Sequence, residues 1–424
     1  MSGKFGPIRT EAGISSGNMW TLFYAAFVSI GLVTGMAAIT PYVLTTNLGI
    51  AEADQGKALG LLAFWQEVVL ILIYSPLGVL ADRLGRRLIY VLGFVTLGIA
   101  YVIYPFAETL TELSLYRVVY AVGIGAVTGM FATIIADYAQ LEDRGKLTAM
   151  LGFLNGLGIV CVALSVGKLP AYFVGNGATD IEAGRYAMWV VAAFCFMSAL
   201  FLVRGLKDGT PAYAKERKPF MAMMAEGFAV AKTNRRIALS YAAAFVARGD
   251  VAIVGLFAIA WGKQAAVADG LNASDALAAG TIPFVIAQSA ALLWPAAMAV
   301  PLDRWPRLVS LGTAMMLGAF GYCLLYFVDD PLSGAAIPFF MLLGIGQISA
   351  FLGAQTTISK EAPEAMRGSI IGAFNFCGAV GILVLTALGG WLFDHVGPWA
   401  PFMVVGILNG VVGLLAFDAH RREH

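Results

Sequence analysis

Long apolar segments recur along the whole sequence, and breaks that hold charged residues, glycine or proline separate them. An α-helix needs about 20 apolar residues to cross a bilayer, and these segments reach or exceed that length. Strands of membrane barrels alternate in hydrophobicity over about ten residues, whereas these segments are apolar throughout. The sequence therefore predicts an all-α membrane protein.

Composition supports this prediction, because 59% of the 424 residues are hydrophobic and 12% are charged. Soluble domains carry about 25% charged residues. This excludes a water-soluble globule, and with it most soluble enzymes. The 27 basic and 26 acidic residues give a net charge of +1 and no electrostatic reason for a nucleic-acid partner. We expect no enzyme activity, cofactor or metal site.

The apolar segments predict twelve transmembrane helices, and the longest hydrophilic connection falls midway among them. That connection, residues 205–235, separates an N-terminal six-helix bundle (1–204) from a C-terminal one (236–424). It forms either a short amphipathic helix at the membrane face or a plain linker. The predicted helices are 20–45, 57–81, 88–107, 111–136, 146–172, 186–204, 236–262, 275–301, 307–327, 332–358, 367–392 and 398–418.

The distribution of lysine and arginine predicts the orientation. If the N-terminus is cytoplasmic, 21 of the 27 basic residues fall in cytoplasmic segments and four fall outside, at Lys57, Lys168, Arg185 and Lys263. We therefore expect both termini in the cytoplasm and the protein in the plasma or inner membrane.

The two predicted bundles repeat one another in sequence. Ala-Phe-Val-x-x-Gly at 26–31 recurs at 244–249, an offset of 218. Asp-Arg at 82–83 recurs at 303–304, and Arg-Gly at 144–145 recurs at 367–368. Matches in register indicate two halves of the same topology, related by an axis along the membrane normal.

The sharpest local motif is Gly78-x-x-x-Asp82-Arg83-x-Gly85-Arg86-Arg87, at the cytoplasmic end of the second predicted helix. It resembles the G-x-x-x-D-R-x-G-R-R signature of the major facilitator superfamily. The resemblance implies twelve helices in two bundles, a substrate site between them and alternating access. It also implies that the motif holds a cytoplasmic gate, whereas a positive topology anchor would explain only the arginines.

The second half carries a degenerate copy of the motif. It keeps Asp303, Arg304 and Arg307, but Ala299 and Pro306 replace the two glycines. Its contribution to a gate is therefore open.

Glu67 and Arg117 lie within predicted transmembrane helices, where a charge is costly and indicates function. Their depths in the first bundle are similar. Burial favours the protonated carboxyl and a nearby guanidinium favours the ionised one, so a change in their separation could bind and release a proton. A permanent structural ion pair is the alternative. Arg117, followed by Gly123 and Gly125, partly resembles the R-x-x-x-G-x-G pattern of drug/proton antiporters.

Arg248 and Asp250 lie midway along the seventh predicted helix. Residues two apart on a helix point about 200° apart, so we expect only one of them to face substrate. Arg248 suits a carboxylate or phosphate, and Asp250 suits a cation or proton. Alternatively, each of the two side chains hydrogen-bonds to polar groups on a neighbouring helix.

Uncharged polar side chains within the predicted helices are further candidates for the substrate cavity. Bonding between helices is the better explanation for any one of them. They are Asn155, Gln288, Gln347 and Asn375.

These features favour a secondary active transporter that exports amphiphilic organic compounds in exchange for protons. One alternative is an organic-anion carrier that uses Arg117 and Arg248, and another is a membrane sensor or scaffold that does not transport. The expected partners are a small-molecule substrate, protons and the lipid bilayer, and we expect a monomer.

Overall fold

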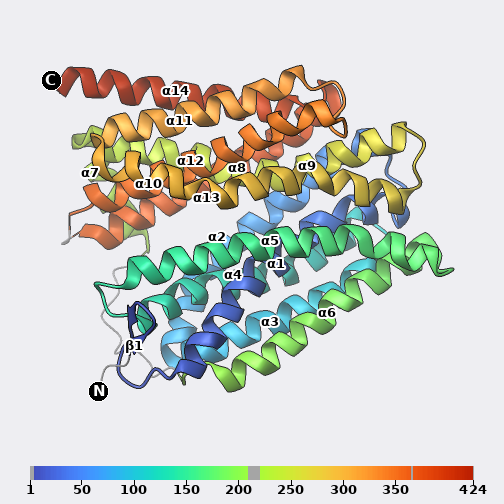
Figure 1. Ribbon diagram of the computed structural model, residues 1–424, viewed down its shortest axis with the longest axis horizontal. Helices are drawn as coiled ribbons and strands as arrows, with labels where there is room; N and C mark the ends of the chain where they lie inside the picture. The colour runs from blue at the N-terminus through green and yellow to red at the C-terminus, as the bar shows by residue number, and fades with distance from the viewer. Residues whose placement is uncertain (1–3, 209–219, 364–365, 424) are drawn as a thin grey trace. The chain divides into compact units, whose positions relative to one another are not determined.

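The computed structural model describes residues 4–208, 220–363 and 366–423. Within them, β1 (Lys4–Phe5) and β2 (Ile8–Arg9) form a small antiparallel hairpin, and long helices make up most of the rest (Figure 1). The helices are α1 (Ser16–Thr46), α2 (Gln55–Leu84), α3 (Arg86–Ile103), α4 (Leu110–Tyr138), α5 (Arg144–Gly175), α6 (Asp180–Gly205), α7 (Phe220–Thr233), α8 (Arg235–Ala268), α9 (Ala273–Leu293), α10 (Pro295–Arg304), α11 (Arg307–Cys323), α12 (Ile337–Glu361), α13 (Arg367–His395) and α14 (Ala400–Glu423).

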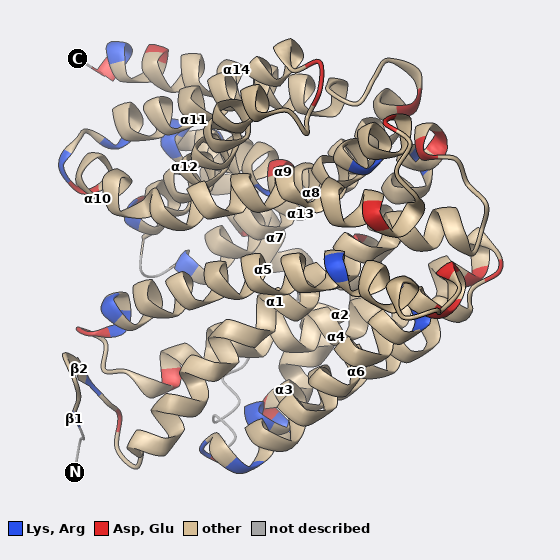
Figure 2. Ribbon diagram, turned by 45° about the vertical axis from the view of Figure 1, so that its right-hand side comes forward, with Lys and Arg blue, Asp and Glu red and all other residues tan. Residues whose placement is uncertain are grey.

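Twelve of the helical segments in the described residues are long and apolar enough to cross a membrane, which confirms the predicted fold class. Figure 2 shows lysine, arginine, aspartate and glutamate mostly near helix ends and in connections. Large apolar side chains are exposed on the outward faces of many helices, for example Leu72 and Phe320. Such faces suit lipid, which solvates apolar side chains.

The chain divides into two compact units. Unit 1 comprises Met1–Ile50, Val68–Glu216 and Asn272–Ala278, and unit 2 comprises Ala51–Glu67, Arg217–Leu271 and Ala279–His424. Helix α2 is therefore shared, because its first part groups with the C-terminal helices. The division of the chain at residues 204 and 236 into two bundles stays a prediction, and residues 209–219 of the central connection lie outside the described residues.

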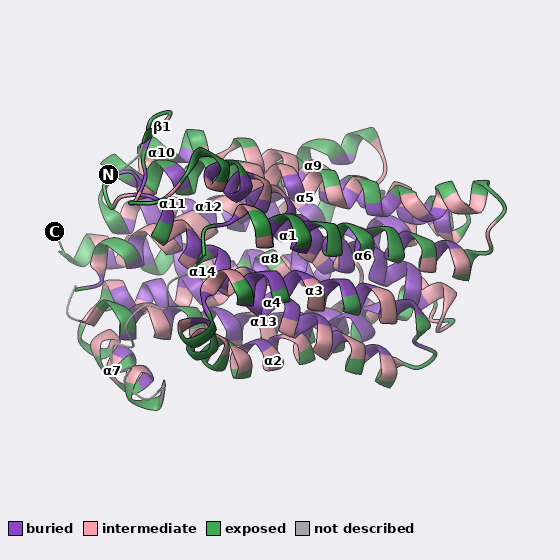
Figure 3. Cartoon of the chain, turned by 90° about the horizontal axis from the view of Figure 1, so that it is seen from below, coloured by how far each residue is buried: buried purple, intermediate pink, exposed green. Residues whose placement is uncertain are grey.

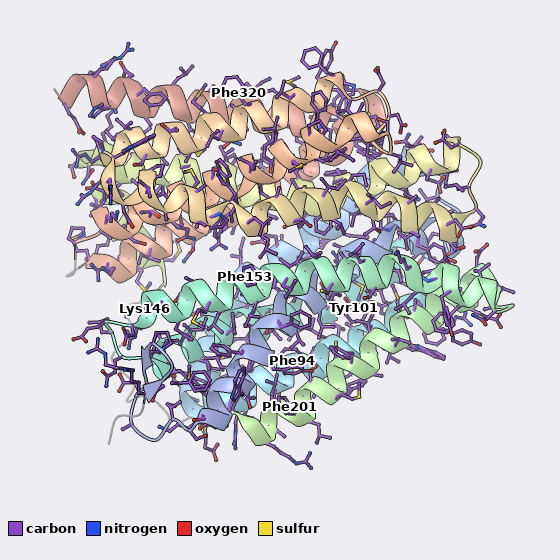
Figure 4. The ribbon with its side chains drawn as sticks, viewed as in Figure 1. Phe94, Tyr101, Lys146, Phe153, Phe201 and Phe320 are labelled. Atoms are coloured by element: carbon purple, nitrogen blue, oxygen red, sulfur yellow. The ribbon has the colours of Figure 1, made fainter. Side chains whose placement is uncertain are left out.

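Unit 1 is built on close packing of α1 with α5 and of α3 with α4 and α6. Phe94 and Tyr101 on α3 are fully buried, whereas Phe201 on α6 is about half exposed (Figure 4). Buried and exposed residues mix along many of the helices (Figure 3). Helix α1 differs, because it has no exposed residue between 21 and 46.

Glycine allows a very close helix approach in both units, at equivalent positions. A Cβ at Gly158 on α5 would overlap the carbonyl oxygen of Phe27 on α1, and a Cβ at Gly381 on α13 would overlap the carbonyl oxygen of Phe245 on α8. The offsets are 223 and 218, the same as those of the sequence repeat. The repeated sequence thus forms a repeated helix crossing.

Unit 2 is built around α8, which packs against α12, α13 and α14, while α11 packs against α12 and α14. Helix α7 packs along α13, and the Ser369 hydroxyl on α13 donates to Glu226 on α7. The Tyr241 hydroxyl on α8 donates to the Gly227 carbonyl of α7. Of the two alternatives for the central connection, a helix therefore forms at 220–233.

Two predicted features differ in the structure. The eighth predicted helix, 275–301, is divided at Trp294 into α9 and α10, because Pro295 has no N–H to continue the helix. Lys263, placed outside the membrane by the charge pattern, lies within α8 with no exposed surface. Its ammonium pairs with Glu52 at 2.9 Å, which makes burial of the charge tolerable.

Candidate functional site

Glu67 occupies the middle of α2 and is 6% exposed. Within unit 2, Arg248 on α8 is the charged residue that acts electrostatically on its carboxyl. A buried carboxylate in a membrane is costly and depends strongly on any nearby cation. The structure thus gives Glu67 a cationic neighbour that sequence reasoning did not assign to it.

Arg117 lies on α4 in unit 1 and is 3% exposed. Its guanidinium lies 4.8 Å from the ring centroid of Tyr120 and donates to the Thr40 hydroxyl at 3.5 Å. The Tyr120 hydroxyl in turn donates to the Val33 carbonyl. These contacts tie Arg117 to α1 and to its own helix. Pairing of Arg117 with Glu67, which groups with the other unit, stays a prediction.

Arg248 and Asp250 have different neighbours, as their spacing on α8 requires. Arg248 is half-buried and donates to the Asn375 side chain on α13 at 2.9 Å. Asp250 has no exposed surface, and neither of its carboxyl oxygens has a hydrogen-bond partner among the described residues. One residue therefore faces α13 and the other faces the interior of unit 2.

The other polar candidates are distributed rather than gathered. Gln288 on α9 donates to Gln347 on α12 at 3.1 Å, an interhelical bond of the kind that holds membrane helices together. Asn375 is exposed apart from its bond to Arg248. The buried side-chain oxygen of Asn155 on α5 has no hydrogen-bond partner among the described residues. Each could contact a substrate, and this role stays a prediction.

The predicted gate motif forms the junction between α2 and α3. Gly85 has a φ of +96°, which favours glycine and explains the residue at this turn. Arg86 pairs with Asp137 at the end of α4, and Arg87 pairs with Asp208 at 2.6 Å. Gly78 and Asp82 are half-buried and Arg83 is exposed. The arginines thus anchor this junction within unit 1.

A cavity of about 380 Å³ lies beside this junction in unit 1. Its charged lining comes from the starts of α3 and α5, from the ends of α4 and α6, and from the N-terminal arm, which is residues 4–15. The charged lining residues are Glu11, Arg86, Arg87, Asp137, Arg144, Lys207 and Asp208.

The second-half copy of the motif, in unit 2, keeps an ion pair between its arginine and an acidic residue, although it lacks the two glycines of the first copy. Arg307 pairs at 2.6 Å with Glu361, at the end of α12, and Asp303 lies 3.5 Å from Lys360. Arg304 is exposed. Arg307 therefore repeats the pairing of Arg86 in unit 1.

Sequence reasoning missed the acidic partners of these arginines. Asp137 and Glu361 are 224 residues apart, since 361 minus 137 is 224, which is close to the repeat offsets. A search for acidic residues at that offset could have found both. Tyr120 and Thr40, which contact Arg117, carried no such signal because uncharged residues are common in membrane helices.

Within the described residues, no three histidine, cysteine, aspartate or glutamate side chains lie together in an arrangement that could hold a metal ion. The four cysteines are free thiols.

The chain is similar to membrane transporters over nearly its whole length. The fold matches nucleoside transporter NupG, with a TM-score of 0.72, 16% identity and coverage of 95% of this chain and 98% of that one. It also matches the D-xylose-proton symporter, with a TM-score of 0.67, 16% identity and coverage of 95% and 98%.

Relatives in sequence include magnetosome protein MamH of Paramagnetospirillum magneticum, 28% identical over 95% of this chain and 92% of MamH. The chain spans 63% of magnetosome protein MamZ of the same organism, with 26% identity over 96% of this chain. Multidrug resistance protein 3 of Bacillus subtilis is 28% identical over 43% of this chain and 35% of that protein.

The family model of the Major Facilitator Superfamily matches residues 21–386. This match, the twelve apolar helices and the gate motif lead to one conclusion. The chain belongs to the major facilitator superfamily, an integral membrane protein with a transporter fold.

Proposed function

We propose that this protein is a secondary active transporter that exports amphiphilic small organic compounds in exchange for protons, by alternating access. The observation that carries the proposal is Glu67, a nearly buried carboxyl in the middle of a membrane helix with the Arg248 charge acting on it. The partial similarity to multidrug resistance protein 3 supports export of such compounds.

The chemistry of coupling follows from the surroundings of Glu67. A carboxyl in a low-dielectric site is stable when it is protonated or when a cation compensates its charge. Movement of α8 that carries the Arg248 guanidinium away from Glu67 favours proton uptake, and its return favours release. Binding of an amphiphile near these residues then competes with the proton.

The test uses purified protein in proteoliposomes with ethidium as the cationic amphiphile and a pH-sensitive dye inside. We expect Glu67→Gln to slow ethidium-driven proton movement at least about tenfold, because the titrating group is lost. Ethidium binding should be retained. Glu108→Gln removes an exposed carboxyl and is the matched control. Proton movement retained in Glu67→Gln would refute the coupling role.

Arg248 favours a second candidate function, transport of organic anions. Its guanidinium is half-buried, and its Nε has no hydrogen-bond partner among the described residues. A guanidinium with free donor capacity can bind a carboxylate by two parallel hydrogen bonds.

Thermal unfolding in the presence of ethidium and of benzoate separates the two candidates, because a ligand that binds the folded state raises its stability. Stabilisation by benzoate alone, lost in Arg248→Ala, would establish the anion carrier instead. Stabilisation by either compound without accumulation in proteoliposomes would indicate a sensor.

The location proposed from the charge pattern is the plasma or inner membrane, with both termini in the cytoplasm. MamH and MamZ are named as magnetosome proteins, so association with magnetosomes is the second candidate location. A fluorescent fusion distinguishes a continuous cell-boundary signal from signal on internal membranes.

A further inference from the structure

The end of α13 contacts the start of α2 within unit 2. Asp394 on α13 accepts hydrogen bonds from the backbone N–H groups of Gly56 and Lys57, at 2.7 and 2.8 Å. These two N–H groups belong to the first turn of α2, where the helix itself supplies no acceptor for them. A carboxylate from α13 thus acts as a cap for α2, which makes the start of α2 depend on its contact with α13.

The neighbouring side chains, Lys57 and His395, make a second contact between the same two helices. The Lys57 ammonium nitrogen lies 3.3 Å from Nε2 of His395. An ammonium group can only donate, so Nε2 accepts in this contact. The other ring nitrogen, Nδ1, lies 2.9 Å from the carbonyl oxygen of Trp391, which can only accept. Nδ1 therefore carries the hydrogen, and His395 is the neutral tautomer whose Nε2 lone pair faces Lys57.

Trp391 holds the His395 ring in this orientation. The two rings are stacked, with centroids 4.9 Å apart and an angle of 10° between their planes. An indole face also accommodates a cation, so the imidazole can take up a proton without leaving Trp391. Protonation places a hydrogen on Nε2 and brings two positive charges within 3.3 Å of each other. The contact with Lys57 is therefore incompatible with the protonated ring.

Other charged groups lie on the elements around this contact. The short helix η1 (Glu52–Asp54) precedes α2, and its Glu52 is paired with Lys263 on α8 at 2.9 Å. Asp54 is exposed, so water and salt screen its charge. Both oxygens of Asp394 accept backbone hydrogen bonds from α2. On α14, residues 400–417 carry no charge. Lys57 is thus the charged group whose atoms contact Nε2 of the ring.

We propose that Lys57 and His395 form a pH-sensitive latch between the start of α2 and the end of α13. While the imidazole is neutral, Lys57 donates to it and reinforces the adjacent bonds to Asp394. Histidine is the side chain whose charge changes between about pH 5 and pH 8. The latch is therefore closed when the ring is neutral and is lost as the pH falls and the ring takes up a proton. The first turn of α2 then opens more often.

The position of the latch on α2 suggests what it could control. Helix α2 begins in unit 2 and continues in unit 1 beyond residue 67, so the latch acts on a helix that both units share. The charge pattern predicts that Lys57 lies outside the cytoplasm, which would make the latch responsive to external pH. This link to transport rests on the proposed function, whereas the latch itself does not.

Amide hydrogen exchange of the purified full-length protein measures opening of the first turn of α2. After correction for the intrinsic effect of pH, protection of the Gly56 and Lys57 amides should fall about threefold between about pH 7.5 and about pH 5.5. In His395→Gln and in Lys57→Met, protection should not change with pH, because one of the two charges is absent. His420→Gln, at the end of α14, is the matched control and should respond as the parent does. Thermal unfolding shows whether each variant is folded.

Nitrogen NMR with isotope-labelled histidine tests the tautomer directly, because the chain has only two other histidines, His420 and His424. We expect a neutral ring with its hydrogen on Nδ1, in a signal that is lost in His395→Gln. A hydrogen on Nε2 at neutral pH would overturn the proposal. So would equal pH dependence of exchange in the parent and in folded His395→Gln. Neither readout requires transport, so failure of the latch and failure of the Glu67 coupling role are distinguishable.

Discussion

Hydrogen bonds of a few residues hold the N-terminal arm, residues 4–15, against the start of α5 in unit 1. The Arg9 guanidinium and its backbone N–H both donate to Asp143 at 2.9 Å, and Lys146 donates to the same carboxyl at 2.8 Å. These hydrogen bonds, chiefly those from Arg9, hold the pKa of Asp143 well below its usual range. The arm is therefore attached through an ionised carboxylate.

We predict that acid and Asp143→Asn both release this arm. Because the pKa of Asp143 is lowered on folding, its stabilising effect is complete above the ordinary aspartate pKa of about 4 and is lost as the pH falls below it. At pH 7, Asp143→Asn should increase the rate of trypsin cleavage after Arg9 severalfold. Glu142→Gln is the control, since Glu142 touches only the exposed end of Arg9. Equal cleavage rates for Asp143→Asn and the parent would contradict this attachment.

Individual helices approach one another most closely where glycine removes the side chain. Gly158 on α5 lies against the Phe27 carbonyl of α1, whereas Gly152 on the same helix has no atom within 4 Å of where a Cβ would be. The two glycines therefore differ in packing although both lie in one membrane helix.

We predict that Gly158→Ala lowers the free energy of unfolding by about 1–3 kcal/mol, the usual cost of overpacking. Gly152→Ala, the matched control, should not lower it, because alanine favours a helix over glycine by about 0.5–1 kcal/mol and a Cβ at Gly152 meets no atom within 4 Å. Chemical denaturation of both variants in detergent checks this. A similar loss of stability in both variants would contradict the α1–α5 crossing as its cause.

Residues 51–67, which include the start of α2, are held in unit 2 by an ion pair of Glu52 and by backbone hydrogen bonds of α2. Lys263 pairs with Glu52, and Asp394 accepts hydrogen bonds from the backbone N–H groups of Gly56 at 2.7 Å and Lys57 at 2.8 Å. A Cβ at Gly56 would overlap Asp394 and the backbone of α13. These contacts explain why residues 51–67 group with unit 2.

We predict that Glu52→Gln destabilises the protein by about 3 kcal/mol, because it leaves a fully buried ammonium without its counter-charge. Replacing both residues, Glu52→Gln with Lys263→Met, should recover most of this loss, since neither member of this pair is then charged. Thermal unfolding of the single and double variants measures the difference. A double variant as unstable as Glu52→Gln would show that the ion pair is not the source of the effect.

At the scale of the whole molecule, the repeated sequence produces repeated contacts. Arg86, at the start of α3, and Arg307, at the start of α11, each pair with an acidic residue at the end of the next α-helix, Asp137 on α4 or Glu361 on α12. The two crossings at Gly158 and Gly381 repeat in the same way. Duplication is therefore visible in both units, each taken separately.

We predict that both termini are cytoplasmic, because 21 of 27 basic residues then lie on the cytoplasmic side. Alkaline phosphatase inserted after Gly177, in the connection between α5 and α6, should be active, since this enzyme works outside the cytoplasm. The same enzyme at the C-terminus should be inactive, and green fluorescent protein there should fluoresce. The reverse result would invert the proposed orientation.

The number, order and approximate positions of the membrane helices followed from the sequence alone. A bilayer forces each apolar segment to satisfy its own backbone hydrogen bonds, so each helix is a local property of its residues. The motif at 78–87 and the repeat were also visible in the sequence, because both depend on spacing along the chain, whereas the gate role of the motif stays a prediction. The break between α9 and α10 was readable in principle from Pro295, but the apolar pattern continues across it.

The neighbours of each buried polar residue were decided only by the tertiary structure. The sequence predicted that Arg248 and Asp250 diverge, but not that Arg248 bonds to Asn375 on α13, 127 residues further along the chain. Nor did it predict that Lys263 is buried against Glu52. Helix formation is local, whereas these contacts depend on how each helix is rotated about its axis against its neighbours, which packing between distant segments determines.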